Sequence, residues 1–76
     1  MPRLPLLSDD EIIRVLERAF GFRLVSQKGS HAKLRRREGD RIITTIVPRH
    51  REVARGTLKG ALDLAEVSEE DFLRQL

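Results

Sequence analysis

Six consecutive β-branched residues, from Ile42 to Val47, stand directly before Pro48. Branching at Cβ restricts χ1 in a helix and suits the pleated surface of a sheet. The run therefore predicts a strand over residues 41–47 that ends at the proline. Glu38-Gly39-Asp40, just before the run, has the composition of a hairpin turn. The chain is therefore expected to reverse there and to pair residues 31–37 with this strand.

A second tight turn is expected at Gly29-Ser30, and it predicts a further strand over residues 22–28. Three strands that follow one another through tight turns form an antiparallel sheet. Such a sheet can bury one face under helices and leave the other face to solvent.

A helix is expected before the sheet, over about residues 9–20. Ser8 and Glu11 have the spacing of a capping box, in which each side chain accepts a hydrogen bond from the other residue's backbone N–H. Apolar residues then recur at helical spacing. Gly21 follows as the residue that can adopt the left-handed conformation at the end of a helix.

Two helices are expected after the sheet. Thr57 is the predicted cap of the first, and Ser68 is the predicted cap of a short last helix. Gly60 lies inside the first of these helices, where glycine is unfavourable, and this predicts close packing of the helix against the sheet.

The element order is thus α-β-β-β-α with a final helical turn or two, which is an α+β fold with a three-stranded antiparallel sheet and helices on one face. With 76 residues and one expected core, the chain is predicted to be a single domain over residues 1–76. Residues 1–7 are expected to form a loose arm.

Charge is strongly segregated along the chain. Residues 18–59 hold twelve Lys and Arg against three acidic residues, a net charge of +9, and the remainder has a net charge of −6. A basic block between acidic flanks is typical of a nucleic-acid-binding surface, and a charged solvated surface is the alternative. The chain has no Cys, no long apolar run and no signal-peptide pattern. The expectation is a soluble cytoplasmic domain without disulfides or membrane contact.

His31, one of only two histidines, directly follows the Gly29-Ser30 turn. Because side chains alternate across a strand, His31, Lys33 and Arg35 are expected on one face of the sheet. Ala32 is then expected on the opposite face, toward the core. An imidazole among cations is placed for acid–base chemistry on a polyanion. Equally, it could be an ordinary polar residue of a strand that only binds one.

Other chemistries have little support in the sequence. The two histidines lie on separate elements without a carboxylate pattern, so no metal site and no other cofactor is expected. No Gly-rich phosphate loop is present. Ser30 and His31 are adjacent and would point to opposite faces, which argues against a serine nucleophile. RNA cleavage stays possible, because RNA brings its own 2′-OH nucleophile and needs only proton carriers and cations.

Several short motifs occur together in a fixed order: Gly21-Phe22, Val25-x-Gln27-Lys28-Gly29-Ser30-His31, Val47-Pro48-x-His50 and Arg55-Gly56-Thr57-Leu58. In this order and spacing, over nearly the whole chain, they resemble the HicA family, the small messenger-RNA interferase toxins of prokaryotic toxin-antitoxin pairs. The chain departs from the usual family pattern at Ala32, at Lys59-Gly60-Ala61 and at Glu66.

The resemblance implies a fold like that of double-stranded-RNA-binding domains and a metal-independent endoribonuclease activity with His31 as the catalytic residue. Gly29 would allow the tight turn, and Ser30 would brace it or contact phosphate. His50 would contact RNA or have a structural role. Together with the charge pattern and the alternation, this predicts an RNA-binding set of Lys28, Ser30, Lys33, Arg35, Arg37, Arg49 and His50.

The resemblance also implies two partners, messenger RNA and a cognate HicB-type antitoxin. The protein is expected to be a monomer alone and to form a larger assembly with the antitoxin. A second function class stays open, namely a non-catalytic RNA-binding module of the same fold. A third possibility is a degenerate, inactive member of the family.

Overall fold

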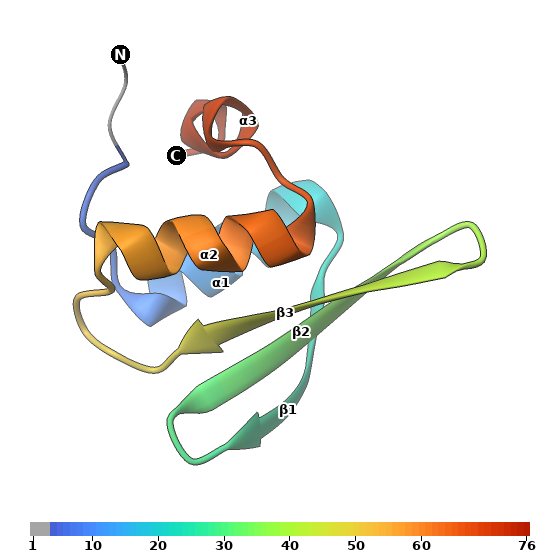
Figure 1. Cartoon of the computed structure of the whole chain (residues 1–76), viewed down its shortest axis with the longest axis horizontal. Coiled ribbons are helices and arrows are strands. Elements are labelled where there is room, and N and C mark those ends of the chain that lie inside the picture. The colour runs from blue at the N-terminus through green and yellow to red at the C-terminus, as the bar shows by residue number, and fades with distance from the viewer. Residues whose placement is uncertain (1–3) are drawn as a thin grey trace.

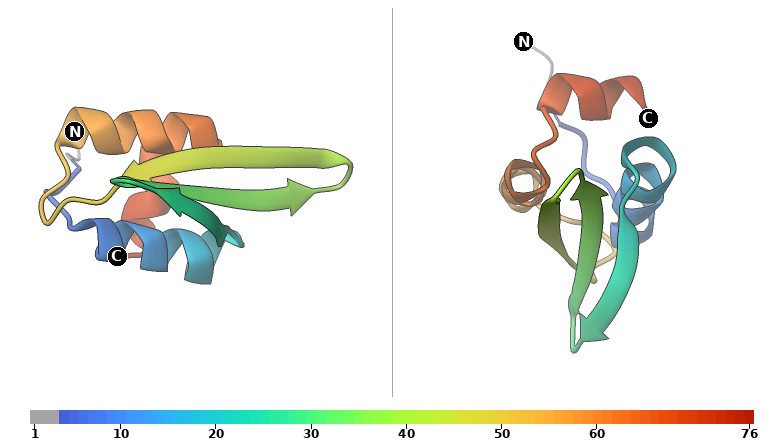
Figure 2. Two further views of the ribbon diagram at one scale, coloured as in Figure 1. Left: turned by 90° about the horizontal axis from the view of Figure 1, so that it is seen from below. Right: turned by 90° about the vertical axis from the view of Figure 1, so that its right-hand side faces the viewer.

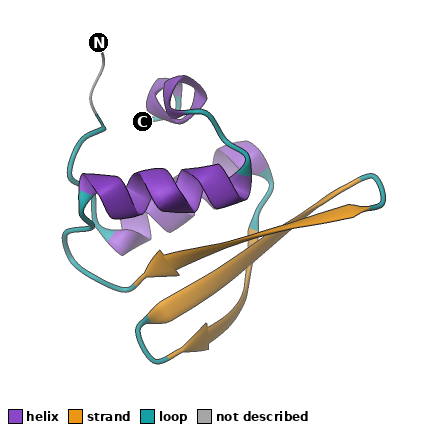
Figure 3. Cartoon of the chain, viewed as in Figure 1, coloured by secondary structure: helices purple, strands orange, loops and turns teal. Residues whose placement is uncertain are grey.

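The computed structural model describes residues 4–76 as three helices and three strands, with the order expected from the sequence (Figure 1, Figure 3). The sheet order is β1-β2-β3, and both strand pairs are antiparallel. The elements are α1 (Asp9–Phe20), β1 (Arg23–Lys28), β2 (His31–Glu38), β3 (Arg41–Pro48), α2 (Arg55–Ala65) and α3 (Glu69–Arg74). In the described part of the chain, no helix is long and apolar enough to cross a membrane.

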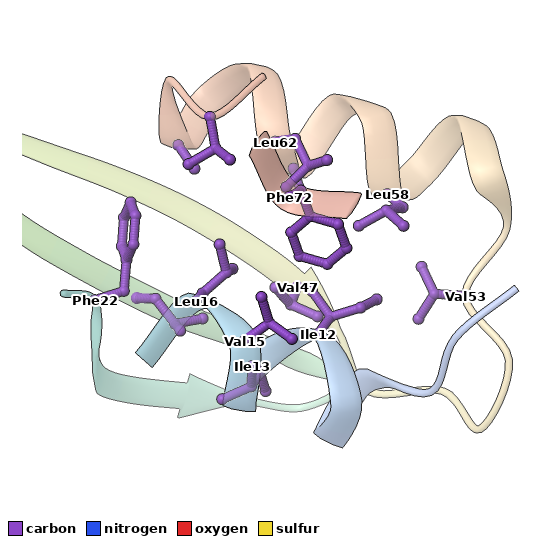
Figure 4. Packing of buried hydrophobic residues seen from close by; sticks show 14 of the residues in the cluster. Ile12, Ile13, Val15, Leu16, Phe22, Val47, Val53, Leu58, Leu62 and Phe72 are labelled. Carbon is purple, nitrogen blue, oxygen red and sulfur yellow. The ribbon is translucent and has the colours of Figure 1, made fainter. Parts of the chain in front are cut away.

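Helices α1 and α2 lie side by side on one face of the sheet, and α3 lies beyond them on the side away from the strands (Figure 2). Between these layers, buried side chains from α1, β3, α2 and α3 meet in one core, among them Leu16, Val47, Leu62 and Phe72 (Figure 4). Among the described residues, no helix lies over the other face of the sheet, as the sequence predicted. We call it the outer face.

Both predicted capping serines are confirmed. The Ser8 hydroxyl accepts from the Glu11 N–H at 3.1 Å, and the Glu11 carboxylate accepts from the Ser8 N–H at 2.9 Å. The bond from the Ser8 backbone holds the pKa of Glu11 below its ordinary value. Ser68 caps α3 in the same way, through the Asp71 N–H. Gly21 ends α1 with a φ of +73°, as predicted.

The predicted start of α2 is wrong. The helix begins at Arg55 after an Ala54 cap that makes no side-chain hydrogen bond, so Thr57 lies inside the first turn. Tertiary contacts set this earlier start. The Val53 N–H donates to the Leu7 carbonyl at 2.8 Å, and Arg55 Nε donates to the Leu4 carbonyl at 2.6 Å. These bonds hold Val53 and Arg55, which lie four and two residues before the threonine.

The same contacts show that residues 4–7 do not form a loose arm. Leu4 and Leu7 are buried in the core, and Leu7 forms an isolated β-bridge with Val53. Burial of the two leucine side chains offsets much of the entropy cost of ordering this segment, because each buried side chain of this size is worth about 1.5–3 kcal/mol. Residues 1–3 of the predicted arm lie outside the described residues.

The structure also contradicts the packing reason given for Gly60. A Cβ atom built there would meet nothing within 4 Å, so close approach to the sheet does not explain the glycine. We therefore expect Gly60→Ala to raise the free energy of unfolding by about 0.5–1 kcal/mol, because alanine is the better helix former. Thermal unfolding followed by circular dichroism should show a Tm higher by roughly 2–8 °C.

Gly39→Ala is the matched control for this substitution. Gly39 also has open space around its Cβ position, but its φ is +60°. The same change should therefore lower stability there, because an L-residue in the left-handed region costs about 1–2 kcal/mol. A Gly60→Ala protein that melts below the wild type would show that the glycine has a role in packing after all.

Candidate functional site

The middle strand presents its polar side chains to the outer face. Along β2, Ala32 and Leu34 are fully buried toward the helices, and His31 and Arg35 are exposed on the opposite side. The predicted alternation is therefore confirmed, and it also carries Lys33 and Arg37 to the outer face. In β3 the buried residues are Ile43, Thr45 and Val47. The residues between them face outward beside β2.

A bulge in β1 sets which residues lie next to His31. Arg23 pairs with Arg35 at one end of the strand, but the register shifts before Ser26, so that Ser26 pairs with Lys33 and Lys28 with His31. One extra residue, Val25, is inserted there. Without the bulge, continuous pairing from Arg23 would place Gln27 opposite His31. The bulge therefore brings the Lys28 ammonium beside the imidazole.

These side chains line one shallow hollow on the outer face, which we call the His31 hollow. Its lining residues come from all three strands: Ser26, Lys28, His31, Lys33 and Ile46. The turn beside it has Gly29 with a φ of +58° and Ser30 without a positive φ, the pattern of a type II′ hairpin turn. This turn starts β2 at His31, so the imidazole stands at the end of the sheet with a cation on each side.

The loop after β3 is tied to this turn. The Arg49 N–H donates to the Ser30 carbonyl at 2.6 Å, and the Asp9 N–H donates to the His50 carbonyl at 3.0 Å. The Arg49 guanidinium reaches the first turn of α1, where it lies 3.1 Å from Asp9 and 3.0 Å from Asp10. The exposed His50 is thus held at the same end of the sheet as His31.

Arg49 differs from the other predicted RNA-binding cations because it is paired with carboxylates. Its charge is matched by two carboxylates on the helix side of the sheet, and its side chain is half-buried. A guanidinium held in this way orders the loop, whereas the other predicted cations lie on the outer face without a carboxylate partner in residues 4–76. The RNA contact of Arg49 stays a prediction.

The outer face carries five cations that have no carboxylate partner within residues 4–76: Arg23, Lys28, Lys33, Arg35 and Arg37. Two neighbouring acidic groups are engaged elsewhere, because Glu38 pairs with Arg36 at 3.3 Å and Glu66 pairs with Arg41. Unpaired charges of one sign on one open face produce a positive potential that attracts polyanions.

Arg36 does not lie on the same face of the sheet as its neighbours Arg35 and Arg37. Its guanidinium lies over the buried Phe22 ring, 5.3 Å from the centroid, and its side chain is largely shielded from solvent. The alternation thus divides Arg35, Arg36 and Arg37 between the two faces of the sheet.

Three residues of this surface were not singled out from the sequence: Arg23, Ser26 and Ile46. Ile46 could have been found from its alternation in β3. The bulge that places Ser26 has no signal in the sequence, because no glycine or proline marks it. Among the described residues, no group of three or more His, Cys, Asp or Glu side chains could hold a metal ion.

Comparisons with known proteins add one match. The family model described as "HicA toxin of bacterial toxin-antitoxin" matches residues 10–67, a segment that contains all three strands and both histidines. The comparisons with curated proteins and with solved structures found no match.

Proposed function

Since the chain belongs to the HicA toxin family and is the toxin of a toxin-antitoxin pair with a cognate antitoxin, we propose that it is an endoribonuclease that cleaves messenger RNA without a metal ion. The observation that carries this proposal is the His31 hollow. An exposed imidazole lies there between Lys28 and Lys33, on the face of the sheet that the helices leave open.

The reaction that these groups suit is transesterification of RNA. The 2′-oxygen attacks the adjacent phosphorus, its proton passes to a base, and the bond from phosphorus to the 5′-oxygen breaks as that oxygen takes up a proton. The products are a 2′,3′-cyclic phosphate and a 5′-hydroxyl. Imidazole exchanges protons near neutral pH, so His31 can serve as the general base or general acid of this reaction.

The neighbouring cations supply the remaining chemistry. Negative charge grows on the phosphate oxygens in the transition state, and the ammonium groups of Lys28 and Lys33 are placed to stabilise it. Arg35 and Arg37 continue the cationic row along β2 and would bind phosphates farther along the strand. Ser30 lies in the turn that precedes His31, and His50 lies in the loop that is bonded to this turn. We expect each of them to contact the RNA backbone.

We further propose that the antitoxin acts by covering the outer face. Messenger RNA is large, so a partner that obstructs the approach to His31 suffices to stop cleavage. The five outer-face cations without a carboxylate partner in residues 4–76 favour a partner with an acidic surface. We expect the toxin alone to be a monomer and the pair to form a larger assembly.

The test is cleavage of RNA by purified protein in EDTA. The wild type should remain active, and its products should end in 2′,3′-cyclic phosphate and begin with a 5′-hydroxyl. Magnesium should leave the rate nearly unchanged, because no step needs a metal ion. A protein that binds the same RNA but leaves it intact would instead be the non-catalytic module. Cleavage seen only with added magnesium would refute the mechanism proposed here.

A further inference from the structure

A second hollow, lined by residues of all three strands, lies on the sheet away from His31. It lies toward the turn of the β2–β3 hairpin. This hairpin projects beyond the helices (Figure 1). We call this second hollow the arginine hollow. Its apolar part is formed by Leu24, Val25 and Ile42, and its cationic part by Arg23, Arg35 and Arg37 together with Arg36, which pairs with Glu38. It measures about 280 Å³, just under the range of roughly 300–1,000 Å³ that is typical of sites for drug-sized ligands. A single nucleobase is a smaller ligand than these.

Three of the six large apolar side chains that are exposed in the described part of the chain lie together in this hollow. Ile42 is 60% exposed, Val25 47% and Leu24 45%. Val25 lies here because it is the residue inserted by the β1 bulge, which places both Val25 and Ser26 opposite Lys33. The bulge that sets the register at His31 therefore also adds an apolar side chain to the second hollow.

Apart from Arg36, the cations of the arginine hollow are free to bind a ligand. Arg23 and Arg35 are register partners, and Arg37 is the register partner of Ile42. None of these three arginines has a carboxylate partner within residues 4–76. A site that bound phosphate alone would have no use for three exposed apolar side chains. A nucleotide matches both parts, because its base is a flat, weakly polar surface and its phosphates are anionic.

We propose that the arginine hollow holds an unpaired base of the RNA substrate, a few nucleotides from the phosphate that is cleaved at His31. The base would pack on Ile42 and Val25, and a guanidinium plane would stack on it or bind the flanking phosphates. This proposal rests on the proposed function, because the position of the base is given relative to the phosphate that is cleaved at His31.

The spacing of the two hollows supports one continuous strand of RNA. His31 and Arg35 are four residues apart on β2, which corresponds to about 13 Å at roughly 3.3 Å per residue. A stacked strand rises about 3.4 Å per nucleotide and would cover this distance in about four nucleotides, and an extended strand would need fewer. One nucleotide position near the cut should therefore affect cleavage through its base.

The experiment is an abasic scan of a short RNA whose cleavage site in the wild type has been mapped. A series of RNAs carries one abasic nucleotide at each position within five of the cut. We expect one position at which loss of the base lowers kcat/KM by roughly 5- to 100-fold, the range that base-stacking contacts provide. If no position shows such a loss, the hollow holds no base.

Ile42→Ser then tests whether that base lies in the arginine hollow. The substitution removes apolar surface at a site with little burial, so the fold should tolerate it. The abasic penalty is the ratio of kcat/KM for the intact RNA to kcat/KM for the abasic RNA. In this variant the abasic penalty should fall toward 1, because the base and the Ile42 side chain form one contact. Leu64→Ser is the matched control, since Leu64 is 57% exposed on α2 and lies outside the hollow. It should keep the full penalty, and an equal penalty in Ile42→Ser would overturn the proposal.

A binding measurement separates this proposal from the proposed function. In the His31→Ala background, Ile42→Ser should weaken binding of the unmodified RNA by roughly 5- to 100-fold, and Leu64→Ser should not. This result would support the hollow even if the wild type cleaved no RNA. If Ile42→Ser weakened binding of the cognate antitoxin and left RNA affinity unchanged, the hollow would be a protein-docking site and the proposal would be wrong.

Discussion

His31→Ala should reduce RNA cleavage by about 10²- to 10⁴-fold, the usual contribution of a general acid or base. The same variant should keep its Tm nearly unchanged, because His31 is exposed and truncating an exposed side chain usually changes stability by no more than about 0.5 kcal/mol. It should still bind RNA through the neighbouring cations. Expression of the variant without antitoxin should no longer arrest growth.

Single-turnover rates, thermal unfolding and RNA affinity should be measured on the same preparation. Gln27→Ala is a suitable control, because Gln27 is an exposed β1 residue that pairs with Ala32 and does not line the His31 hollow. This control should cleave at close to the wild-type rate. Normal cleavage by His31→Ala would remove the imidazole from the mechanism, whatever the state of the fold.

Reversing two charges at the centre of the outer face should weaken RNA binding strongly. Lys33→Glu combined with Arg35→Glu removes two cations that have no carboxylate partner within residues 4–76 and adds two anions to the same row. We expect affinity to fall at least about tenfold at moderate salt. The slope of log affinity against log salt should become shallower by about 2, one for each lost phosphate contact. Filter binding or fluorescence anisotropy at several salt concentrations measures both.

The control must change the net charge by the same amount. Arg14→Glu combined with Arg74→Glu does so on α1 and α3, on the helix side of the sheet, so it separates the outer face from a general effect of charge. That control should retain most of the affinity and slope. If the outer-face variant bound RNA as tightly as the wild type, the interface would lie elsewhere, with the loop of Arg49, His50 and Arg51 as the next place to examine.

Much of this architecture follows from signals that are local in the sequence. Capping at Ser8 and Ser68 depends on hydrogen bonds within four residues, and the turn at Gly29 depends on the conformational freedom of a single residue. The outward position of His31 depends on a period of two along one strand. Such features are predictable because all their partners lie within a few positions along the chain.

The features that were predicted wrongly depend on contacts between residues that are far apart in the sequence. Thr57 has the right side chain for a cap, but α2 begins earlier because Val53 and Arg55 are held by the backbone of residues some 50 positions away. Residues 4–7 precede the first helix signal, which predicts an arm, but Leu4 and Leu7 pack into the core. The start of α2 and the burial of residues 4–7 therefore depend on which segments of the chain pack together in the folded protein.

The amino-acid sequence by itself determined the order of the elements, the open cationic face and the place of His31 on it, because alternation, turn chemistry and charge act over short distances. Only the tertiary structure decided what surrounds that imidazole. The β1 bulge brings Lys28 and Ser26 beside it, and the pairing of Arg49 with α1 fixes the adjoining loop. Both depend on strand pairing and packing between distant segments, whose free energies belong to the assembled fold and not to any one stretch of chain.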